Sequence, residues 1–155
     1  AAKVPEHVQN YVEVFNAVTG KNIDKDELVL QSERVYNFQR VFQLRLGKGT
    51  RKYHNIPDRA LGPVWADEWE AREEYYDNEL KATGIDPAGL SSQDKCDRLL
   101  KKRREQWEEL VDAVYKRRGW DKNGIPTVKK LKSLGMDLPE VVATVEKYAK
   151  PEDQW

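Results

Sequence analysis

The sequence has almost none of the side chains that hold redox metals. Its 155 residues include one cysteine, Cys96, and two histidines, His7 and His54. One cysteine cannot form an intrachain disulfide or supply the thiolates that a zinc site or an iron–sulfur cluster needs. The histidines lie far apart and form no Glu-x-x-His or His-x-x-x-His pattern. We therefore assign no metal-binding or cofactor-binding residue in this chain.

The usual catalytic motifs are also missing. There is no glycine-rich phosphate loop after a strand, no serine nucleophile elbow and no zinc-ligand spacing. Cys96 lies between Lys95 and Asp97 with no histidine nearby, which favours a structural or surface thiol over a nucleophile. Adjacent carboxylates such as Glu73 and Glu74 point in different directions on a helix and cannot act on one bond. No catalytic residue is assigned, and the chain alone is expected to be inactive.

A net charge and long apolar runs are absent as well. Lys and Arg number 27, and so do Asp and Glu, so the overall field favours neither nucleic acid nor an anionic membrane as a partner. In the basic cluster 101–104, Arg104 has Glu108 four residues later, which indicates a solvated, mutually paired helix face. No apolar run approaches the roughly 20 residues that cross a bilayer, and no signal peptide is recognised. These absences predict a cytoplasmic protein.

Helical periodicity is the main positive signal. Apolar residues recur at three- and four-residue steps, and we expect helices over residues 7–19, 24–46, 66–82, 91–118, 127–134 and from 137 onward. Asp24, Ser91, Thr127 and Asp137 stand where capping side chains are needed. No segment alternates as a strand does. The prediction is an all-α, irregular bundle of about five to six helices, with residues 1–155 forming a single domain.

Two aromatic and apolar features add to this prediction. Val35, Phe38 and Phe42 mark residues 24–46 as a long amphipathic helix. The five tryptophans are better explained by packing between helices than by a cofactor site. Trp155 is the exception, because at the end of the chain it is expected to dock on a neighbouring surface.

A long loop, expected to be ordered, follows the second helix and covers residues 48–63. It contains Arg51, Tyr53, His54 and Arg59. A loop imidazole among these groups could orient a substrate carbonyl or phosphate, and a surface or hydrogen-bonded structural role is the plainer alternative. Both interpretations stay open at this point.

Several segments carry a resemblance to a known family: residues 16–20, 33–47, 56–57, 115–127 and 131–135. The most specific is 115–127, in which Gly119 can close a helix, a turn follows Asp121, and Thr127 can cap the next helix. In order and spacing these segments resemble the C-terminal domain of the tungsten-containing aldehyde:ferredoxin oxidoreductase family. Aryl-CoA ring reductases are related members of that family.

The resemblance implies an enzyme with a tungsten (or molybdenum) bis-pterin and a 4Fe–4S cluster. Such enzymes move electrons between an aldehyde-level substrate and an acceptor such as ferredoxin. The family's cofactor motifs lie upstream of Ala1, so the chain is expected to be a C-terminal fragment that holds no cofactor itself. Residues 53–55 depart from the family's acidic pattern, and 87–106 look like an enlarged helical hairpin, so the substrate is left open.

We therefore expect a helical domain that covers the cofactor-bearing domains and shapes part of the substrate channel, with Tyr53, His54 and Arg59 as channel candidates. Its partners would be the upstream domains of the same polypeptide, and a ferredoxin or an electron-transfer subunit. The alternative is a cofactor-free helical protein-interaction module that works through its aromatic helix faces.

Overall fold

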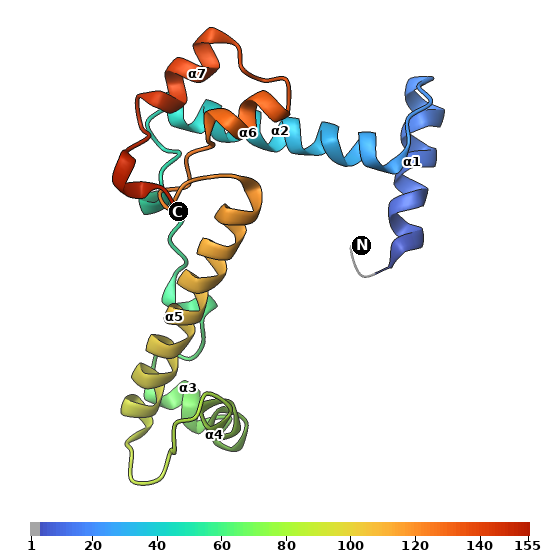
Figure 1. Cartoon of the computed structure of the whole chain (residues 1–155). Coiled ribbons are helices and arrows are strands. Elements are labelled where there is room, and N and C mark those ends of the chain that lie inside the picture. The colour runs from blue at the N-terminus through green and yellow to red at the C-terminus, as the bar shows by residue number, and fades with distance from the viewer. Residues whose placement is uncertain (1–3) are drawn as a thin grey trace. The chain divides into compact units, whose positions relative to one another are not determined.

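Helices dominate the computed structural model, which describes residues 4–155. No strand occurs in this part of the chain, and seven α-helices are present (Figure 1): α1 Pro5–Thr19, α2 Lys25–Arg45, α3 Ala66–Glu70, α4 Glu73–Ala82, α5 Ser92–Arg118, α6 Val128–Ser133 and α7 Pro139–Glu146. Three 3₁₀ turns complete the secondary structure: η1 Arg51–Tyr53, η2 Asp58–Ala60 and η3 Pro151–Asp153. The all-α prediction is confirmed. None of the helices in residues 4–155 combines the length and the apolar character that crossing a membrane requires.

Local capping chemistry explains where several helices begin. At each of three N-caps a side-chain oxygen accepts a hydrogen bond from the backbone N–H three residues later: Asp24 from Glu27 at 2.8 Å, Ser91 from Asp94 at 3.1 Å and Thr127 from Lys130 at 3.1 Å. A cap of this kind stabilises a helix by about 1 kcal/mol. These three capping side chains were predicted from the sequence, and the structure confirms them. Asp137 was also expected to start the last helix, but that cap is wrong, because α7 begins at Pro139 after Leu138 and has no side-chain cap.

The chain forms two compact units. The terminal unit contains the chain up to Thr50 together with Arg118–Trp155, and the central unit is Arg51–Arg117. That residues 1–155 fold as one domain stays a prediction.

The core of the terminal unit lies between α2, α6 and α7. Its buried residues are Val41, Leu44, Ile125, Leu131 and Val145. α2 contacts both α7 and α1, and α6 packs on α7. Full burial of an aliphatic side chain of this size contributes about 1.5–3 kcal/mol. The core therefore holds together elements from both ends of the chain.

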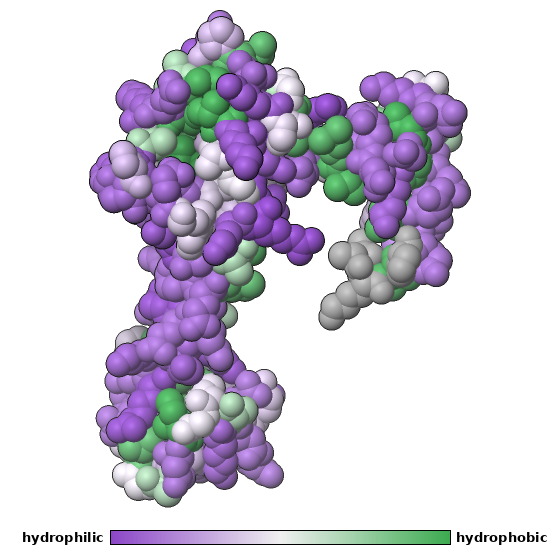
Figure 2. Space-filling view, in the orientation of Figure 1, coloured by the Kyte–Doolittle hydropathy of each residue, from purple (hydrophilic) through white to green (hydrophobic). Residues whose placement is uncertain are grey.

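The apolar stripe of α2 lies on the side away from this core. Four residues spaced by three, four and four positions share that face, and each is 52% to 60% exposed: Val35, Phe38, Phe42 and Leu46. We call them the exposed stripe. The buried residues of α2 are Asn37, Arg40, Val41 and Leu44. Hydrophobic residues also reach the surface on α1 and on the neighbouring end of α2 (Figure 2). The predicted long helix is confirmed as α2, and its apolar face is exposed in the chain as it stands.

The core of the central unit forms where α3 and α4 meet α5. Trp69, Leu80, Cys96 and Leu99 are fully buried there. Residues 66–82 were predicted as one helix, but the structure breaks it between Glu70 and Glu73. The break explains why there are seven helices and not five or six.

A polar network accounts for this break. Trp69 donates its indole N–H to Asp77 at 3.0 Å, and Asp77 also pairs with the buried Lys95 at 2.9 Å. On a continuous helix, positions eight residues apart are separated by about 12 Å along the axis. Turning α3 back onto α4 brings Trp69 and Asp77 together and buries the indole.

Candidate functional site

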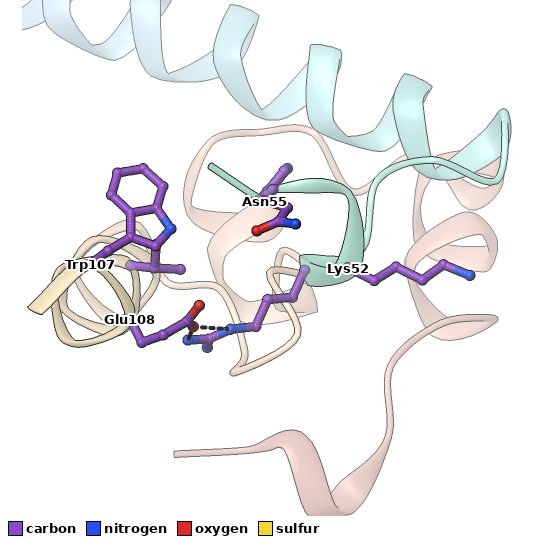
Figure 3. Close-up of a pocket in the computed structure, with 7 residues that line it drawn as sticks. Lys52, Asn55, Trp107 and Glu108 are labelled. Carbon is purple, nitrogen blue, oxygen red and sulfur yellow. Dashed lines mark hydrogen bonds and ion pairs between the residues drawn. The ribbon is translucent and has the colours of Figure 1, made fainter. Parts of the chain in front are cut away.

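One pocket of the central unit lies between the loop 51–55 and α5. It has a volume of about 290 Å³ and is lined by Arg51, Lys52, His54, Asn55, Trp107, Glu108 and Val111. We call it the His54 pocket. Figure 3 shows Trp107 and Glu108 projecting from α5 toward the loop, whereas Lys52 extends away from Glu108. The pocket is therefore made by one helix face and one short turn.

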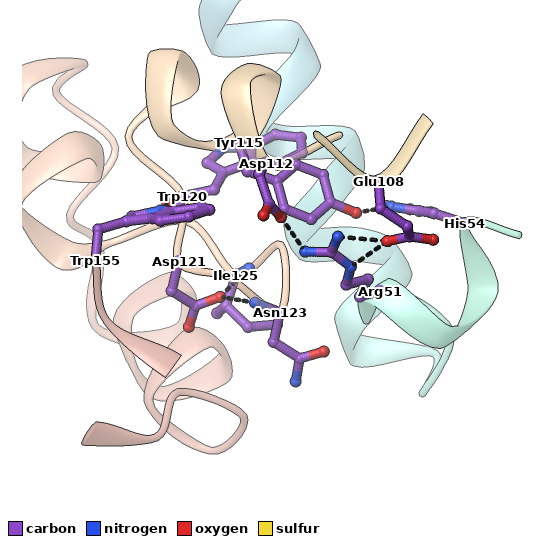
Figure 4. A network of polar contacts seen from close by, with 10 residues as sticks. All are labelled: Arg51, His54, Glu108, Asp112, Tyr115, Trp120, Asp121, Asn123, Ile125 and Trp155. Carbon is purple, nitrogen blue, oxygen red and sulfur yellow. Dashed lines mark hydrogen bonds and ion pairs between the residues drawn. The ribbon is translucent and has the colours of Figure 1, made fainter. Parts of the chain in front are cut away.

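An arginine clamp fixes the loop to the helix. The Arg51 guanidinium donates to Glu108 from Nε at 3.2 Å and from Nη2 at 2.5 Å, and it also pairs with Asp112 (Figure 4). Burial alone would lower the pKa of Arg51, but the hydrogen bonds and charges of the two carboxylates outweigh it and raise the pKa. Arg51 therefore remains charged and rigidly placed.

The imidazole of His54 is oriented by a buried phenol. Its Nδ1 lies within hydrogen-bond distance of the Tyr115 hydroxyl, and the two rings meet edge to face with centroids 5.8 Å apart. Tyr115 is buried in α5. If the hydroxyl donates, Nδ1 accepts and the imidazole proton sits on Nε2. The arrangement thus suits an imidazole that positions a polar ligand group.

The structure does not bring the three channel candidates together. His54 lines the pocket described above. Tyr53 is half exposed, with the Lys52 ammonium 4.9 Å from its ring, and it is not among the residues that line this pocket. Arg59 pairs with Glu68 and lines a different pocket. The channel role of all three residues stays a prediction.

Sequence reasoning placed Arg51 near His54 but missed the α5 residues that accompany them. Arg104 was expected to pair with Glu108 along the helix, but it pairs with Asp58, and Glu108 is taken by Arg51. That expectation was wrong because a tertiary contact replaced the local one. The spacing of Glu108, Asp112 and Tyr115, which puts them on one helix face, was the available signal.

The glycine-bounded turn after α5 adopts the predicted structure. Gly119 has φ 71°, and an added Cβ would lie 3.1 Å from Lys130 Cβ. Asp121 and Ile125 are joined through the Asp121 N–H and the Ile125 carbonyl at 2.9 Å, and Thr127 Oγ1 donates to the Gly119 carbonyl at 2.9 Å. Only glycine adopts this left-handed conformation without strain. The turn is therefore a closed loop that sets the start of α6.

The Asp121 carboxylate organises this loop from the inside. Its Oδ1 accepts from the N–H groups of Asn123 at 2.9 Å and Ile125 at 2.8 Å (Figure 4). The side chain is 1% exposed, and its Oδ2 has no hydrogen-bond partner in the described part of the chain. Burial raises the pKa of Asp121, with a further contribution from Asp153, while the backbone hydrogen bonds oppose it.

The turn packs against α2 through aromatic and cationic side chains. Tyr36 and Trp120 stack with centroids 5.6 Å apart, Arg40 lies 4.3 Å from the Trp120 ring, and Arg118 lies 3.8 Å from the Tyr36 ring. Trp155 donates its indole N–H to the Trp120 carbonyl at 2.7 Å, so the predicted docking of the last residue is confirmed. The segments 33–47 and 115–127 therefore meet in one place.

The residues present do not fit a resident redox centre. Among residues 4–155, no three His, Cys, Asp or Glu side chains come together as metal ligands. Cys96 is fully buried, and its Sγ contacts the Trp65 carbonyl at 3.4 Å. Burial, with the charge of Asp97, raises the pKa of this thiol, so the thiolate that binds iron or zinc is disfavoured.

A family model described as aldehyde ferredoxin oxidoreductase, domains 2 & 3, matches residues 1–136. The match includes the central unit with the His54 pocket, the turn after α5 and the terminal unit as far as Met136, but not α7. No curated protein and no solved structure matches the chain significantly.

Proposed function

The chain belongs to the aldehyde ferredoxin oxidoreductase family, and we propose that it is a helical domain that covers the cofactor-bearing part of such an enzyme. The enzyme would act on an aldehyde or a related carbonyl compound and pass electrons to ferredoxin or an electron-transfer subunit. A tungsten (or molybdenum) bis-pterin and a 4Fe–4S cluster would be held by upstream residues of the same polypeptide. This chain alone would be inactive.

The exposed stripe of α2 is the observation that carries this proposal. Four large apolar side chains in register on one helix face favour an apolar partner surface. The matching family model is described as domains 2 and 3, which supports a further domain in the whole enzyme. We propose that the exposed stripe packs on that further domain. This also explains why residues of a core-like pattern are half exposed in the chain by itself.

The His54 pocket would form part of the substrate channel wall. Arg51, held by Glu108 and Asp112, keeps the loop on α5, and Tyr115 holds the imidazole. In this role His54 would bind and orient the polar end of a substrate, without taking part in electron transfer. Tyr53 and Arg59 would lie further along the wall.

Charge placed on the exposed stripe tests the docking. In the full-length enzyme, Phe38→Glu combined with Phe42→Glu should expose α2 to protease and lower tungsten content and aldehyde oxidation by about tenfold or more, since burying two unpaired carboxylates is costly. Gln43→Glu, exposed on the same helix and turned about 100° from Phe42, should change neither. In the isolated chain, each substitution should change the free energy of unfolding by no more than about 0.5 kcal/mol relative to the parent.

Two outcomes oppose this proposal. Full activity and metal content in the double variant would show that the exposed stripe is not an interface with the rest of the enzyme. If the full-length polypeptide contained neither tungsten nor iron, and the double variant lost binding to a separate protein, the cofactor-free interaction module would be favoured instead.

A histidine pair tests the channel role. His54→Ala in the full-length enzyme should raise KM for the aldehyde by about tenfold while kcat changes less, because a positioning contact is lost. His7→Ala, at the only other histidine of the chain, serves as the control and should leave KM unchanged. Equal effects of the two substitutions would contradict a channel position for His54.

A further inference from the structure

We infer that another pocket of the central unit, the one lined by Arg59, binds the diphosphate group of a small organic phosphate. Its volume is about 310 Å³, and its lining includes three arginines, Arg59, Arg72 and Arg103, together with Tyr75. We call it the arginine pocket. This lining would recognise an anionic group that several guanidinium groups can contact at once.

Arg103 is placed in advance of any ligand. Its Nη1 donates to the Leu61 carbonyl at 2.7 Å, and its Nη2 donates to Glu79 at 2.6 Å. Gly62 has φ 157°, and a Cβ there would lie 3.0 Å from the same Nη1. A glycine at this position lets the guanidinium approach the backbone closely. The Arg103 guanidinium is therefore already held in place, so ligand binding costs this side chain little conformational freedom.

The positive charge of the pocket is only partly neutralised. Arg59 pairs with Glu68, and Arg103 pairs with Glu79. Arg72 has no ion pair in residues 4–155, and its guanidinium lies 4.5 Å from the Tyr75 ring. Three guanidinium groups thus face two carboxylates, and Arg72 is the one whose hydrogen-bond donors are not directed at a carboxylate.

The start of α4 adds to the attraction for an anion. Arg72 is the N-cap residue of this ten-residue helix, and no side chain caps it. The first N–H groups of a helix lack intrahelical acceptors and carry the positive end of its dipole. Glu73 and Glu74 in the same turn oppose this effect, although Glu73 is engaged by Lys95 at 3.0 Å.

The size of the pocket and the presence of Tyr75 narrow the ligand. About 310 Å³ is at the lower end of the range for small-molecule sites, which suits a diphosphate with a small organic part. Tyr75 is half exposed and could stack on a base or another planar ring. The diphosphate could equally come from inorganic pyrophosphate. Both carry the same group, so the experiment has to distinguish them.

Calorimetric titration of the full chain with ADP and with pyrophosphate tests the inference without requiring turnover, so its outcome is independent of the proposed enzyme. Both probes should bind in a saturable manner. Arg72→Gln should weaken both by tenfold or more, because it removes the guanidinium that has no carboxylate partner. Arg98→Gln removes an exposed charge from α5 outside the pocket and should change binding by less than twofold.

Tyr75→Leu separates the two sources of the diphosphate. Weaker ADP binding with unchanged pyrophosphate binding would support an organic phosphate that carries a ring. Unchanged binding of both would overturn the organic part of the inference. Absence of saturable binding to the parent chain, or equal weakening by Arg72→Gln and Arg98→Gln, would overturn the site itself. Unchanged helix content by circular dichroism confirms that each variant is folded.

Discussion

The indole N–H of Trp120 donates a 2.8 Å hydrogen bond to Oδ1 of Asn37, and the two side chains are both buried although 83 positions separate them in the sequence. Asn37 also donates from Nδ2 to the Glu33 carbonyl at 2.9 Å, so both ends of its amide are used. This pair connects the turn after α5 to the buried face of α2. It explains why a polar residue can occupy a core position there.

Replacing Asn37 by leucine should destabilise the chain by about 1–3 kcal/mol, because it leaves the buried indole N–H without an acceptor. Gln39→Leu, on the exposed side of α2, should cost less than about 0.5 kcal/mol. Urea unfolding followed by tryptophan fluorescence measures both. Equal costs would mean that the hydrogen bond does not contribute to stability.

Asp121 should give the stability of the chain a specific pH dependence. Its pKa is raised in the folded chain by burial, so between its ordinary and its raised pKa the folded chain holds more protons than the unfolded chain. The contribution of Asp121 is therefore fully present below its ordinary pKa and is lost as the pH rises through the raised pKa.

Asp121→Asn removes this ionisation and keeps an acceptor for the two backbone N–H groups. Its free energy of unfolding, relative to the parent, should therefore increase as the pH rises from 3 to 7. Asp121→Ala leaves both N–H groups without an acceptor and should cost roughly 1–3 kcal/mol for each. A difference between parent and Asn variant that stays constant with pH would refute the buried-charge explanation.

Lys95 should be the most sensitive charged residue of the central unit. Lys95→Met leaves Asp77 without its counter-ion beside Trp69, and breaking a buried pair costs roughly 3–5 kcal/mol. Burial alone would raise the pKa of Asp77, but hydrogen bonds from Lys95 and Trp69 and the charge of Lys95 hold it below its ordinary value.

The Lys95–Asp77 pair should also make the stability of the chain decrease at acid pH. With a lowered pKa, the stability that Asp77 contributes is present above its ordinary pKa and is lost as the pH falls through the lowered one. The deficit of Lys95→Met, measured by urea unfolding, should therefore be largest near pH 7 and shrink toward pH 3. Lys101→Met, on the same helix, should show no such trend. A pH-independent deficit would argue against the ion pair.

Cys96 provides a probe of whether the two units unfold together. Because the thiol is fully buried with a raised pKa, it should resist a thiol reagent until the central unit opens. If the whole chain is one domain, labelling of Cys96 should begin at the same urea concentration as hydrogen exchange in residues 120–127 of the terminal unit. Well-separated transitions would show that the units are independent domains.

Local sequence signals predicted most of the helix starts. They did not predict features that depend on contacts between residues distant in the sequence. Thr127 and Gly119 could be placed from the sequence because a cap and a left-handed turn depend on neighbouring residues. Val35, Phe38 and Phe42 were correctly put on one face, but periodicity does not say which face is buried. Partners distant in sequence decided that, since Trp120 accommodates Asn37 and Arg40.

The broken helix and the pocket show the same limit. No proline or glycine marks the interruption before Glu73, because its cause is the contact of Trp69 with Asp77. His54 was selected from its loop together with its neighbour Arg51, whereas the partners of Arg51 were missed because they lie 57 and 61 residues away on α5. Residues whose role depends on such distant contacts cannot be identified from local pattern.

Metal analysis together with an aldehyde oxidation assay, carried out on the full-length polypeptide and on the isolated 155-residue chain, tests the central claim most directly. The account predicts tungsten (or molybdenum) and iron with activity in the full-length protein, and neither metal nor activity in the isolated chain. Stoichiometric tungsten or aldehyde oxidation in the isolated chain, or a full-length protein without either metal, would contradict it.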